Sequence, residues 1–166
     1  MSEPLSPYAV RAGTADDLPL VRETIVRAMA WNPERVLPPP EHLLVHPELV
    51  RYHAGWGRAG DLGAVADQDG LPVGMAFCRL FTDDDHGEGY VDAATPELVI
   101  GVADGHRGNG VGRRLLDALA DAARAAGFAQ LSLSVDAANP ALRLYRRAGF
   151  ETLRDDGRDV LMLRRL

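Results

Sequence analysis

The chain contains no lysine. All 18 basic residues are arginine, they are outnumbered by 24 acidic residues, and the formal net charge at pH 7 is −6. Non-specific binding to DNA or RNA requires a basic surface, so this charge balance argues against a nucleic-acid partner. A nucleotide-binding P-loop needs a lysine directly before a serine or threonine, and the missing lysine excludes that type of site.

Cysteine and long apolar runs are scarce as well. The single cysteine, Cys78, cannot form an intramolecular disulfide, fits a reducing compartment and is expected to be a small core residue. Residues 1–4 have neither the basic nor the apolar character of a secretory signal, and no apolar run approaches the ~20 residues of a membrane helix. The 166 residues are 46% hydrophobic and 25% charged, as in ordinary globular proteins. We therefore expect one cytoplasmic domain over residues 1–166, without a membrane or nucleic-acid partner.

Hydrophobic periodicity and turn residues predict an α/β (α+β) chain with the order β-α-α-β-β-β-α-β-α-β-β. Strands are expected over residues 8–11, 62–66, 73–81, 97–102, 131–135 and 159–166, with one more directly after residue 150. Helices are expected after a Thr14–Asp17 capping box, over residues 47–56, after the glycines near residue 110, and after residues 139–140. Residues 33–46 are rich in proline, and Pro38–Pro40 are expected to form a stiff irregular segment, while Asp69–Gly70 predicts a hairpin turn.

The stretch Glu97–Leu116 contains the strongest functional signal. It begins as an apolar strand, passes through Gly108, Gly110 and Gly112, and ends as a helix. A helix N-terminus leaves backbone N–H groups unpaired and carries a partial positive charge, and glycines let an anion come close to those groups. The stretch therefore predicts a site for a phosphate-bearing ligand.

Two common phosphate-binding loops do not fit this stretch. The P-loop lacks its lysine. A dinucleotide fingerprint, G-x-G-x-x-G, that starts at Gly108 would have Arg113 where the third glycine belongs, and it would lie about two-thirds along the chain. The pattern that does fit is Arg-x-x-Gly-x-Gly, from Arg107 to Gly112. A second block follows about 30 residues later at 139–150, Asn-Pro-Ala-Leu-Arg-Leu-Tyr-Arg-Arg-Ala-Gly-Phe.

Together the two blocks resemble the GCN5-related N-acetyltransferase (GNAT) superfamily. Arg-x-x-Gly-x-Gly resembles its pyrophosphate loop, and Asn…Leu-Tyr-x-x-x-Gly-Phe resembles its second signature; the motifs cover about residues 97–151. One departure is Asp104, where many members have proline, which we expect to alter the start of the loop but not the ligand. The resemblance implies a GNAT fold, with a central mixed, mostly antiparallel sheet of roughly six to seven strands that is splayed in the middle and flanked by about four helices.

The resemblance also implies acetyl-CoA as a co-substrate and no metal. The loop N–H groups would bind the pyrophosphate, Arg113 would add charge, and the pantetheine arm would pair with the edge of strand 97–102 as an additional strand. An N–H of that strand could stabilise the oxyanion of the reaction, and Asn139 is expected to cap its helix and contact the pantetheine. The implied cofactor contacts are Ile100, Gly101, Val102, Arg107, Gly108, Asn109, Gly110, Val111, Gly112, Arg113 and Asn139.

Two side chains are expected to move protons. An amine with a pKa of about 10 is mostly protonated at pH 7, and deprotonating it costs ~4 kcal/mol, so a base is expected. Glu97 lies ten residues before Arg107, where the histone-acetylating branch of the family has its general base. The other candidates are a water molecule and the side chains His106, His53 and Asp92. Tyr145, at the tyrosine position of the family, is expected to protonate the leaving coenzyme A thiolate. The alternative for Tyr145 is a core tyrosine without a catalytic role, and the alternative for Glu97 is a surface carboxylate at the start of its strand.

The acceptor is expected to bind beside the first two helices and the loop after Phe81. Candidate lining residues are Trp31, Tyr52, Trp56 and Tyr90. The acidic residues 83–92 are expected to form a solvated loop, with attraction of a cationic amine as the alternative. His42 and His46 are expected to be solvated and not metal ligands.

These expectations combine into one function and one alternative. The function is an acetyl-CoA-dependent N-acetyltransferase, in which a primary amine of a small molecule or peptide attacks the thioester directly within a ternary complex. The alternative is a non-catalytic acyl-CoA sensor or partner-binding module on the same fold. The identity of the acceptor and the formation of a homodimer stay open.

Overall fold

The computed structural model describes residues 7–166, so the prediction about residues 1–4 lies outside the described part of the chain. One sheet of seven strands has the order β1-β2-β3-β4-β5-β7-β6. Its strands are β1 (Tyr8–Ala12), β2 (Leu62–Gln68), β3 (Leu71–Arg79), β4 (Glu97–Val102), β5 (Gln130–Asp136), β6 (Glu151–Asp155) and β7 (Asp159–Arg165). All neighbours are antiparallel except β4 and β5, which are parallel. The predicted mixed, mostly antiparallel sheet is confirmed.

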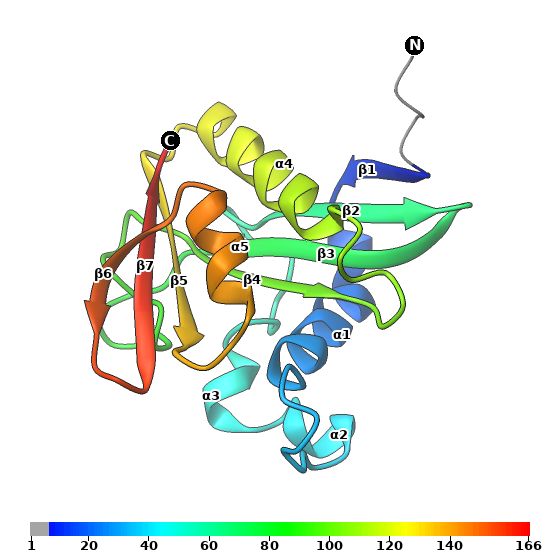
Figure 1. Ribbon diagram of the computed structural model, residues 1–166. Helices are drawn as coiled ribbons and strands as arrows, with labels where there is room; N and C mark the ends of the chain where they lie inside the picture. Colours follow the sequence, from blue (N-terminus) through cyan, green and yellow to red (C-terminus); the bar gives the residue numbers. More distant parts are fainter. Residues whose placement is uncertain (1–6) are drawn as a thin grey trace.

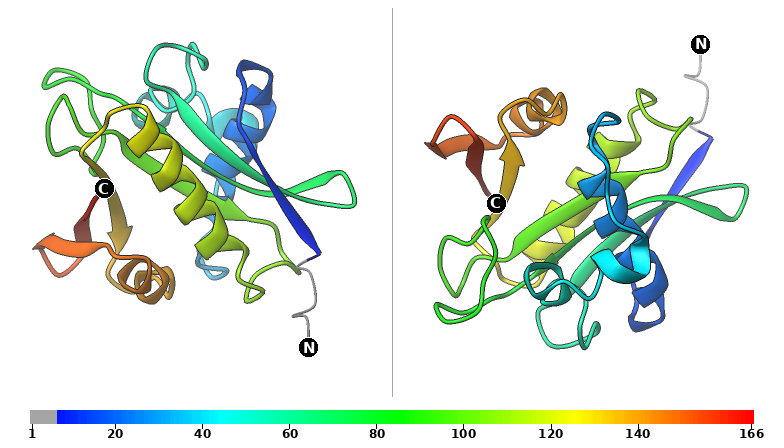
Figure 2. Two further views of the ribbon diagram at one scale, coloured as in Figure 1. Left: turned by 90° about the horizontal axis from the view of Figure 1, so that it is seen from above. Right: turned by 90° about the horizontal axis from the view of Figure 1, so that it is seen from below.

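The α-helices of the described residues cover both faces of this sheet. They are α1 (Leu18–Met29), α2 (Pro40–Leu43), α3 (Pro47–Val50), α4 (Val111–Ala125) and α5 (Ala141–Arg147). Figures 1 and 2 show α4 on one face and α1 on the opposite face, with the short α2 and α3 beyond the end of α1. None of the helices within residues 7–166 has the length and apolar character needed to cross a membrane.

The segment between α1 and β2 corrects two predictions. Pro40, expected to lie in a stiff irregular segment with Pro38 and Pro39, instead begins α2, because the fixed φ of proline suits the first helical position. The helix expected over residues 47–56 is regular only over Pro47–Val50 and continues as turns. It cannot continue through Gly55 and Gly57, whose φ values of 64° and 101° lie outside the right-handed helical region.

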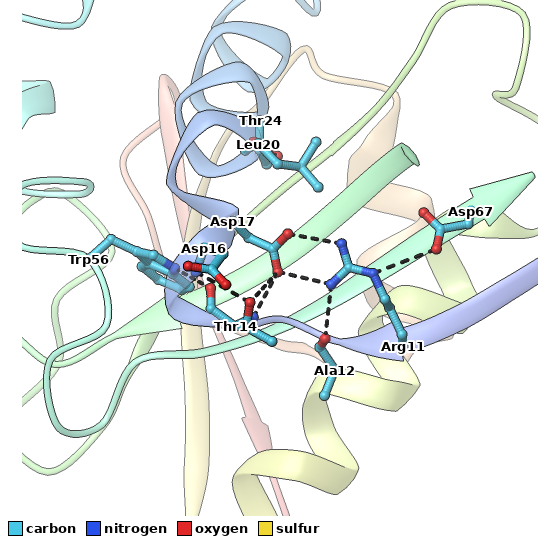
Figure 3. A network of polar contacts seen from close by, with 9 residues as sticks. All are labelled: Arg11, Ala12, Thr14, Asp16, Asp17, Leu20, Thr24, Trp56 and Asp67. Atoms are coloured by element: carbon cyan, nitrogen blue, oxygen red, sulfur yellow. Dashed lines mark hydrogen bonds and ion pairs between the residues drawn. The ribbon is translucent and has the colours of Figure 1, made fainter. Parts of the chain in front are cut away.

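The corner between β1 and α1 is held by polar contacts (Figure 3). The predicted capping box is present: Thr14 N donates to Asp17 Oδ2 at 2.7 Å, and the Thr14 side chain accepts a backbone N–H. Arg11 binds both oxygens of Asp17 at 2.9 Å and lies 3.6 Å from Asp67 of β2. Arg11 therefore holds the pKa of the Asp17 carboxyl below its usual value. Trp56 Nε1 donates to Thr14 O at 2.9 Å, which ties the turns after α3 to the same corner.

Two hydrophobic cores lie on opposite faces of the sheet, and β4 contributes to both. Leu98 and Ile100 pack in the core under α4 with Leu115, whereas Val99 packs in the core under α1. Gly101 allows α1 to approach β4 closely, because a Cβ there would lie 2.9 Å from Arg27 Cβ and 3.0 Å from Thr24 O.

The sheet opens between β4 and β5. The two strands are in register at one pair only, Glu97 with Ser132, where Ser132 N donates to Pro96 O at 3.0 Å. Beyond that pair they diverge, and α5 lies in front of the opening (Figure 1). The predicted splay is confirmed, and it places the glycine loop after β4 on one side of the gap and α5 on the other.

Candidate functional site

The open edge of β4 presents backbone groups to the gap. Ala103 N donates to Val73 O at 2.8 Å, so residue 103 belongs to a pair that is hydrogen-bonded to β3. Hydrogen-bonded and non-bonded pairs alternate along an antiparallel ladder. Gly101 therefore bonds to β3, whereas the N–H and C=O of Ile100 and Val102 point toward β5. An extended ligand that carries amides could pair with these groups as an additional strand.

The predicted β4 contacts thus fall into two kinds. The backbone of Ile100 and Val102 faces the gap, although the Val102 carbonyl already accepts a bond from Arg107 Nε at 3.2 Å. The backbone of Gly101 faces β3, and its Cα lies against α1. Packing alone thus accounts for a glycine at 101, and its contact with a cofactor stays a prediction.

The glycine loop carries an uninterrupted series of unpaired amides. Within residues 7–166, the N–H groups of residues 107–113 donate to no acceptor, and the first helical bond runs from Arg114 N to Gly110 O at 3.2 Å. Gly108 and Gly110 both have a φ of 79°, a conformation that favours glycine, and no atom lies within 4 Å of where their Cβ would be. These amides and the positive end of the α4 dipole form a concave site suited to an anion.

A hollow of about 410 Å³ lies over this loop, lined by Gly108, Gly110, Gly112, Arg113, Leu144 and Arg147. Gly112 allows α5 to close one side, because a Cβ there would lie 2.9 Å from Leu144 Cδ2. Arg113 joins the two helices, since its Nη1 donates to Arg147 O at 2.8 Å, while its Nε donates to Asp117 at 3.0 Å. The hollow is thus bounded by amides from α4 and by two guanidinium-bearing residues.

Glu97 lies at the one point where β4 and β5 meet. Its side chain is on the α1 face, is 5% exposed, and accepts bonds at Oε1 from Tyr52 Oη (2.8 Å) and Gly89 N (3.1 Å). Its other oxygen, Oε2, is buried and has no partner among residues 7–166. A side chain at Gly89 would clash with the carboxylate, so only glycine lets the loop between β3 and β4 cover it.

The burial of Glu97 changes its acidity. Desolvation raises the pKa of this carboxyl to about 7, and the bonds from Tyr52 and Gly89, which favour the charged form, oppose that rise. A carboxylate with a pKa near neutrality can both accept and release a proton under physiological conditions. Burial therefore gives Glu97 a pKa closer to neutrality than that of a surface carboxylate, and its role as a general base stays a prediction.

Tyr145 lies on the other face of the sheet. It is 8% exposed, belongs to the core under α4, and meets Phe150 edge-on with ring centroids 6.1 Å apart. Its hydroxyl has no hydrogen-bond partner among residues 7–166, and burial raises its pKa to about 12. The structure therefore places Tyr145 and Glu97 on opposite faces of the opening rather than in contact, and it leaves a protonated hydroxyl on the α5 side.

The Asn139 side chain bonds to the first turn of α5, as a cap would, although Pro140 and not Asn139 directly precedes the helix. Its Oδ1 accepts a bond from Ala141 N at 2.9 Å, and its own N–H donates to Asp136 O at 2.9 Å. The cap orients α5, which carries Tyr145. A contact between Asn139 and a bound pantetheine stays a prediction.

The other candidate bases have structural partners. His53 is buried, with Nε2 2.8 Å from Leu44 O and Nδ1 accepting from Arg22 at 3.4 Å. Asp92 Oδ1 accepts from Ala94 N (2.9 Å) and from the Thr95 hydroxyl (2.8 Å). His106 Nδ1 lies 3.0 Å from Tyr8 Oη, on the β1 side of the glycine loop. Among the candidate bases, Glu97 is therefore the one with a buried acceptor oxygen, Oε2, that has no hydrogen-bond partner within residues 7–166.

The predicted acceptor-side aromatics also have defined positions. Trp31 is half-buried. Tyr52 packs edge-on against Phe81 with centroids 5.2 Å apart, and Trp56 packs edge-on against Phe77 of β3. Tyr90 stacks on His86 with centroids 4.2 Å apart. Only Tyr52 of these aromatic residues contacts Glu97, so it has the clearest link to the site.

Several acidic side chains of the loop over residues 83–92 are paired with neighbouring groups. Asp83 accepts from the Tyr90 hydroxyl, Asp85 lies 3.0 Å from Arg51 Nε, and Asp92 supports the following turn. Asp84 and Glu88 are the exposed acidic residues of the loop that have no such bond within residues 7–166. The loop thus resembles the expected solvated segment, and a role in attracting a cationic amine stays a prediction.

Arg79 is a buried charge that the sequence analysis overlooked. It is fully buried, binds both oxygens of Asp61 (3.0 and 2.8 Å), and donates to the carbonyls of Arg51 (3.0 Å) and Ala54 (2.6 Å). Its guanidinium carbon lies 5.8 Å from the Trp56 ring centroid. Arg79 thus fixes the turns after α3, which carry the tyrosine that binds Glu97. A charged residue within an apolar strand was the available signal.

No group of three or more His, Cys, Asp or Glu side chains within residues 7–166 is placed to hold a metal ion. His42 and His46 are exposed, and His46 Nδ1 accepts a bond from Glu48 N at 3.2 Å.

Comparisons with known proteins agree with this geometry. Residues 27–150 match the acetyltransferase (GNAT) family. Over 52 residues, which are 31% of this chain and 28% of the relative, the sequence is 52% identical to streptothricin acetyltransferase of Streptomyces lavendulae, so the match spans little more than a quarter of that relative. The ribosomal-protein-alanine N-acetyltransferase from Brucella melitensis is 28% identical, with a TM-score of 0.67 over 95% of this chain and 99% of the other. The PaiA N-acetyltransferase from Thermoplasma acidophilum, in complex with coenzyme A, shares the fold with a TM-score of 0.65 and 18% identity over 96% and 99% of the two chains.

Proposed function

The chain belongs to the acetyltransferase (GNAT) family, and from that premise we propose that it transfers the acetyl group of acetyl-CoA to a primary amine of a small molecule or peptide. One observation carries the proposal: the unpaired amides of residues 107–113 lie directly after a strand whose edge is open toward β5. The amides suit a pyrophosphate and the open edge suits the amide-bearing arm next to it. This juxtaposition matches two adjacent parts of coenzyme A, its pyrophosphate and its pantetheine arm.

The residues around the opening fit acetyl-CoA. The amides of residues 107–113 and Arg113 would hold the pyrophosphate, and Ile100 and Val102 would pair with the pantetheine arm. The bound thioester supplies an activated acetyl group. An N–H of the β4 edge would stabilise the negative charge that develops on the carbonyl oxygen, because the amide is fixed in place before the reaction.

Proton removal from the amine is assigned to Glu97. Its pKa of about 7 leaves about half of the population ionised at pH 7 and makes the carboxylate a stronger base than an ordinary glutamate, so it can take the proton as the amine attacks. Because the carboxylate is 5% exposed, we propose that a water molecule relays the proton from the acceptor to Oε2. Tyr52 and Gly89 hold Oε1 and thereby fix the orientation of Oε2.

Protonation of the leaving thiolate is assigned to Tyr145. Its raised pKa keeps the hydroxyl protonated at neutral pH, and within residues 7–166 no other group uses that proton. Direct attack within a ternary complex is favoured over an acyl-enzyme, because Cys78 is fully buried and burial raises the pKa of its thiol to about 12.

The substitution Tyr145→Phe tests whether Tyr145 protonates the leaving thiolate. We expect a lower kcat, by about a hundredfold or more, with little change in the affinity for acetyl-CoA, because the hydroxyl acts on the leaving group rather than on binding. The acceptor panel includes streptothricin and an alanine-bearing ribosomal-protein peptide, since proteins similar to this chain act on those two classes. An unchanged kcat on an accepted amine would show that Tyr145 is only a core residue.

The alternative is a non-catalytic acyl-CoA sensor on the same fold. The burial of both Glu97 oxygens favours it, since the base has no direct path to an acceptor without a relay. Calorimetry separates the two: a sensor binds acetyl-CoA tightly and releases no thiol with any amine of the panel. Thiol release that depends on the amine supports the transferase.

A further inference from the structure

Tyr8, the first residue of β1, joins the edge of the sheet to the glycine loop. It is 7% exposed, and its ring meets the His106 imidazole edge-on with centroids 5.8 Å apart. Its hydroxyl lies 3.0 Å from His106 Nδ1 and accepts from Asn109 Nδ2 at 3.3 Å. Its carbonyl accepts from Arg114 Nη1 at 2.7 Å. One residue of β1 therefore contacts the start of the loop, its tip and the first turn of α4.

The hydrogen bonds through the Tyr8 hydroxyl have a consistent direction. The Asn109 amide can only donate through Nδ2, so Tyr8 Oη is the acceptor of that bond. The Tyr8 proton can then be donated to Nδ1 of a neutral His106. His106 precedes the unpaired amides and Asn109 lies among them, so this chain of bonds fixes the loop on both sides of Gly108.

The loop needs such a restraint. Gly105, Gly108 and Gly110 have φ values of 83°, 79° and 79°, and glycine has the widest conformational freedom of any residue. An anion binds more tightly to amides that already point at one place, because less conformational entropy is lost on binding. Without an external contact, a loop with three glycines would hold its N–H groups in many orientations.

We propose that Tyr8 is a positioning residue for the pyrophosphate of coenzyme A, which holds the glycine loop in its anion-binding conformation before the ligand arrives. The inference rests on the proposed function. Tyr8 acts through His106 and Asn109 and does not itself touch the ligand. Its contribution is therefore specific to ligands that carry the pyrophosphate, which separates it from a general role in folding.

The test compares Tyr8→Phe with a matched tyrosine variant, Tyr90→Phe. Tyr8→Phe keeps the ring in the core and removes only the hydroxyl. Tyr90→Phe removes a hydroxyl that bonds Asp83 in the loop between β3 and β4. Calorimetry measures the Kd for coenzyme A and for pantetheine, which lacks the pyrophosphate. We expect Tyr8→Phe to weaken coenzyme A binding about tenfold and to leave pantetheine binding within about twofold, and Tyr90→Phe to change neither.

A second variant approaches the same bond from the loop. His106→Ala removes the partner of the Tyr8 hydroxyl together with the edge-on ring contact, and it should reproduce the selective loss if Tyr8→Phe does not fold. Unchanged coenzyme A affinity in the folded variants would overturn the inference, and so would an equal loss for both ligands. Failure of the wild-type protein to bind coenzyme A would overturn the inference together with the proposed function, whereas wild-type binding with unaltered variants would overturn the inference alone.

Discussion

Replacing Tyr52 with phenylalanine should move the pH dependence of acetyl transfer. The Tyr52 hydroxyl donates to Glu97 Oε1 at 2.8 Å and thereby stabilises the charged carboxylate. Phenylalanine keeps the edge-on contact with Phe81 and removes this bond alone. Because the charged form loses a partner, the pKa of Glu97 rises above its present value of about 7.

The size of the shift follows from the energy of one charge-assisted hydrogen bond. Such a bond contributes about 1.5 kcal/mol at the lower end of its range, and one pKa unit corresponds to about 1.4 kcal/mol. The pKa should therefore rise by about one unit, to roughly 8. At pH 7 the ionised fraction of Glu97 then falls from about one half to about one tenth, and the rate falls about fivefold.

The assay is the pH profile of kcat/KM for one accepted amine at saturating acetyl-CoA. The acid limb should move upward by about one unit in Tyr52→Phe, and activity at pH 9 should approach that of the wild type. Titration of the amine affects the pH profiles of both proteins equally, so a difference between the two profiles reports a change in the pKa of a group on the enzyme. Tyr145→Phe serves as the contrasting variant, because it should lower the rate at every pH without moving the acid limb. An acid limb at the same pH in Tyr52→Phe and wild type would refute the assignment of Glu97 as the base.

Two other substitutions test separate parts of the account. Glu97→Gln should strongly reduce transfer and also remove a pH-dependent loss of stability. The folded pKa of Glu97 lies above its reference value of 4.5, so the wild type loses stability as pH rises from about 4.5 to 7. Between pH 4.5 and 8, urea unfolding should show the free energy of unfolding of the wild type falling by about 3 kcal/mol relative to that of Glu97→Gln. The same pH dependence of this free energy in both proteins would contradict a raised pKa for Glu97. Gly101→Ala should lower the free energy of unfolding by about 1–3 kcal/mol, because the added Cβ meets Arg27 and a backbone oxygen, while coenzyme A affinity is retained. A selective loss of coenzyme A affinity with normal stability would instead support Gly101 as a cofactor contact.

Local signals in the sequence predicted most of the elements. Asp69 and Gly70 have φ values of 52° and 81°, as the expected hairpin turn requires, and the Thr14–Asp17 capping box is present. The region between α1 and β2 was harder to predict, because its helices are short and their ends depend on glycine turns and on contacts with β3. Arg79, which holds two carbonyls of that region, comes from a strand more than 20 residues away.

The site was predictable in position but not in detail. The spacing of Arg107, Gly108, Gly110 and Gly112 indicated an anion loop, and the structure shows unpaired amides there. The environment of Glu97 depends on Tyr52, which is 45 positions away, and no periodicity links the two residues. The contact of Tyr8 with the loop spans 98 positions and arises only because the fold brings the first residue of the edge strand β1 beside the loop. Side-chain contacts of this kind follow from the fold and not from the local sequence.

The most direct measurement is acetyl transfer itself, with two products followed in the same reaction. The protein is incubated with acetyl-CoA and each amine of the panel, free thiol is measured over time, and the amine is analysed by mass spectrometry for an added acetyl group. We expect at least one amine to give both products in equal amounts, with release of thiol that is saturable in acetyl-CoA and strongly reduced in Glu97→Gln. Tight binding of acetyl-CoA with neither thiol release nor an acetylated amine across the panel would contradict the transferase and favour the sensor.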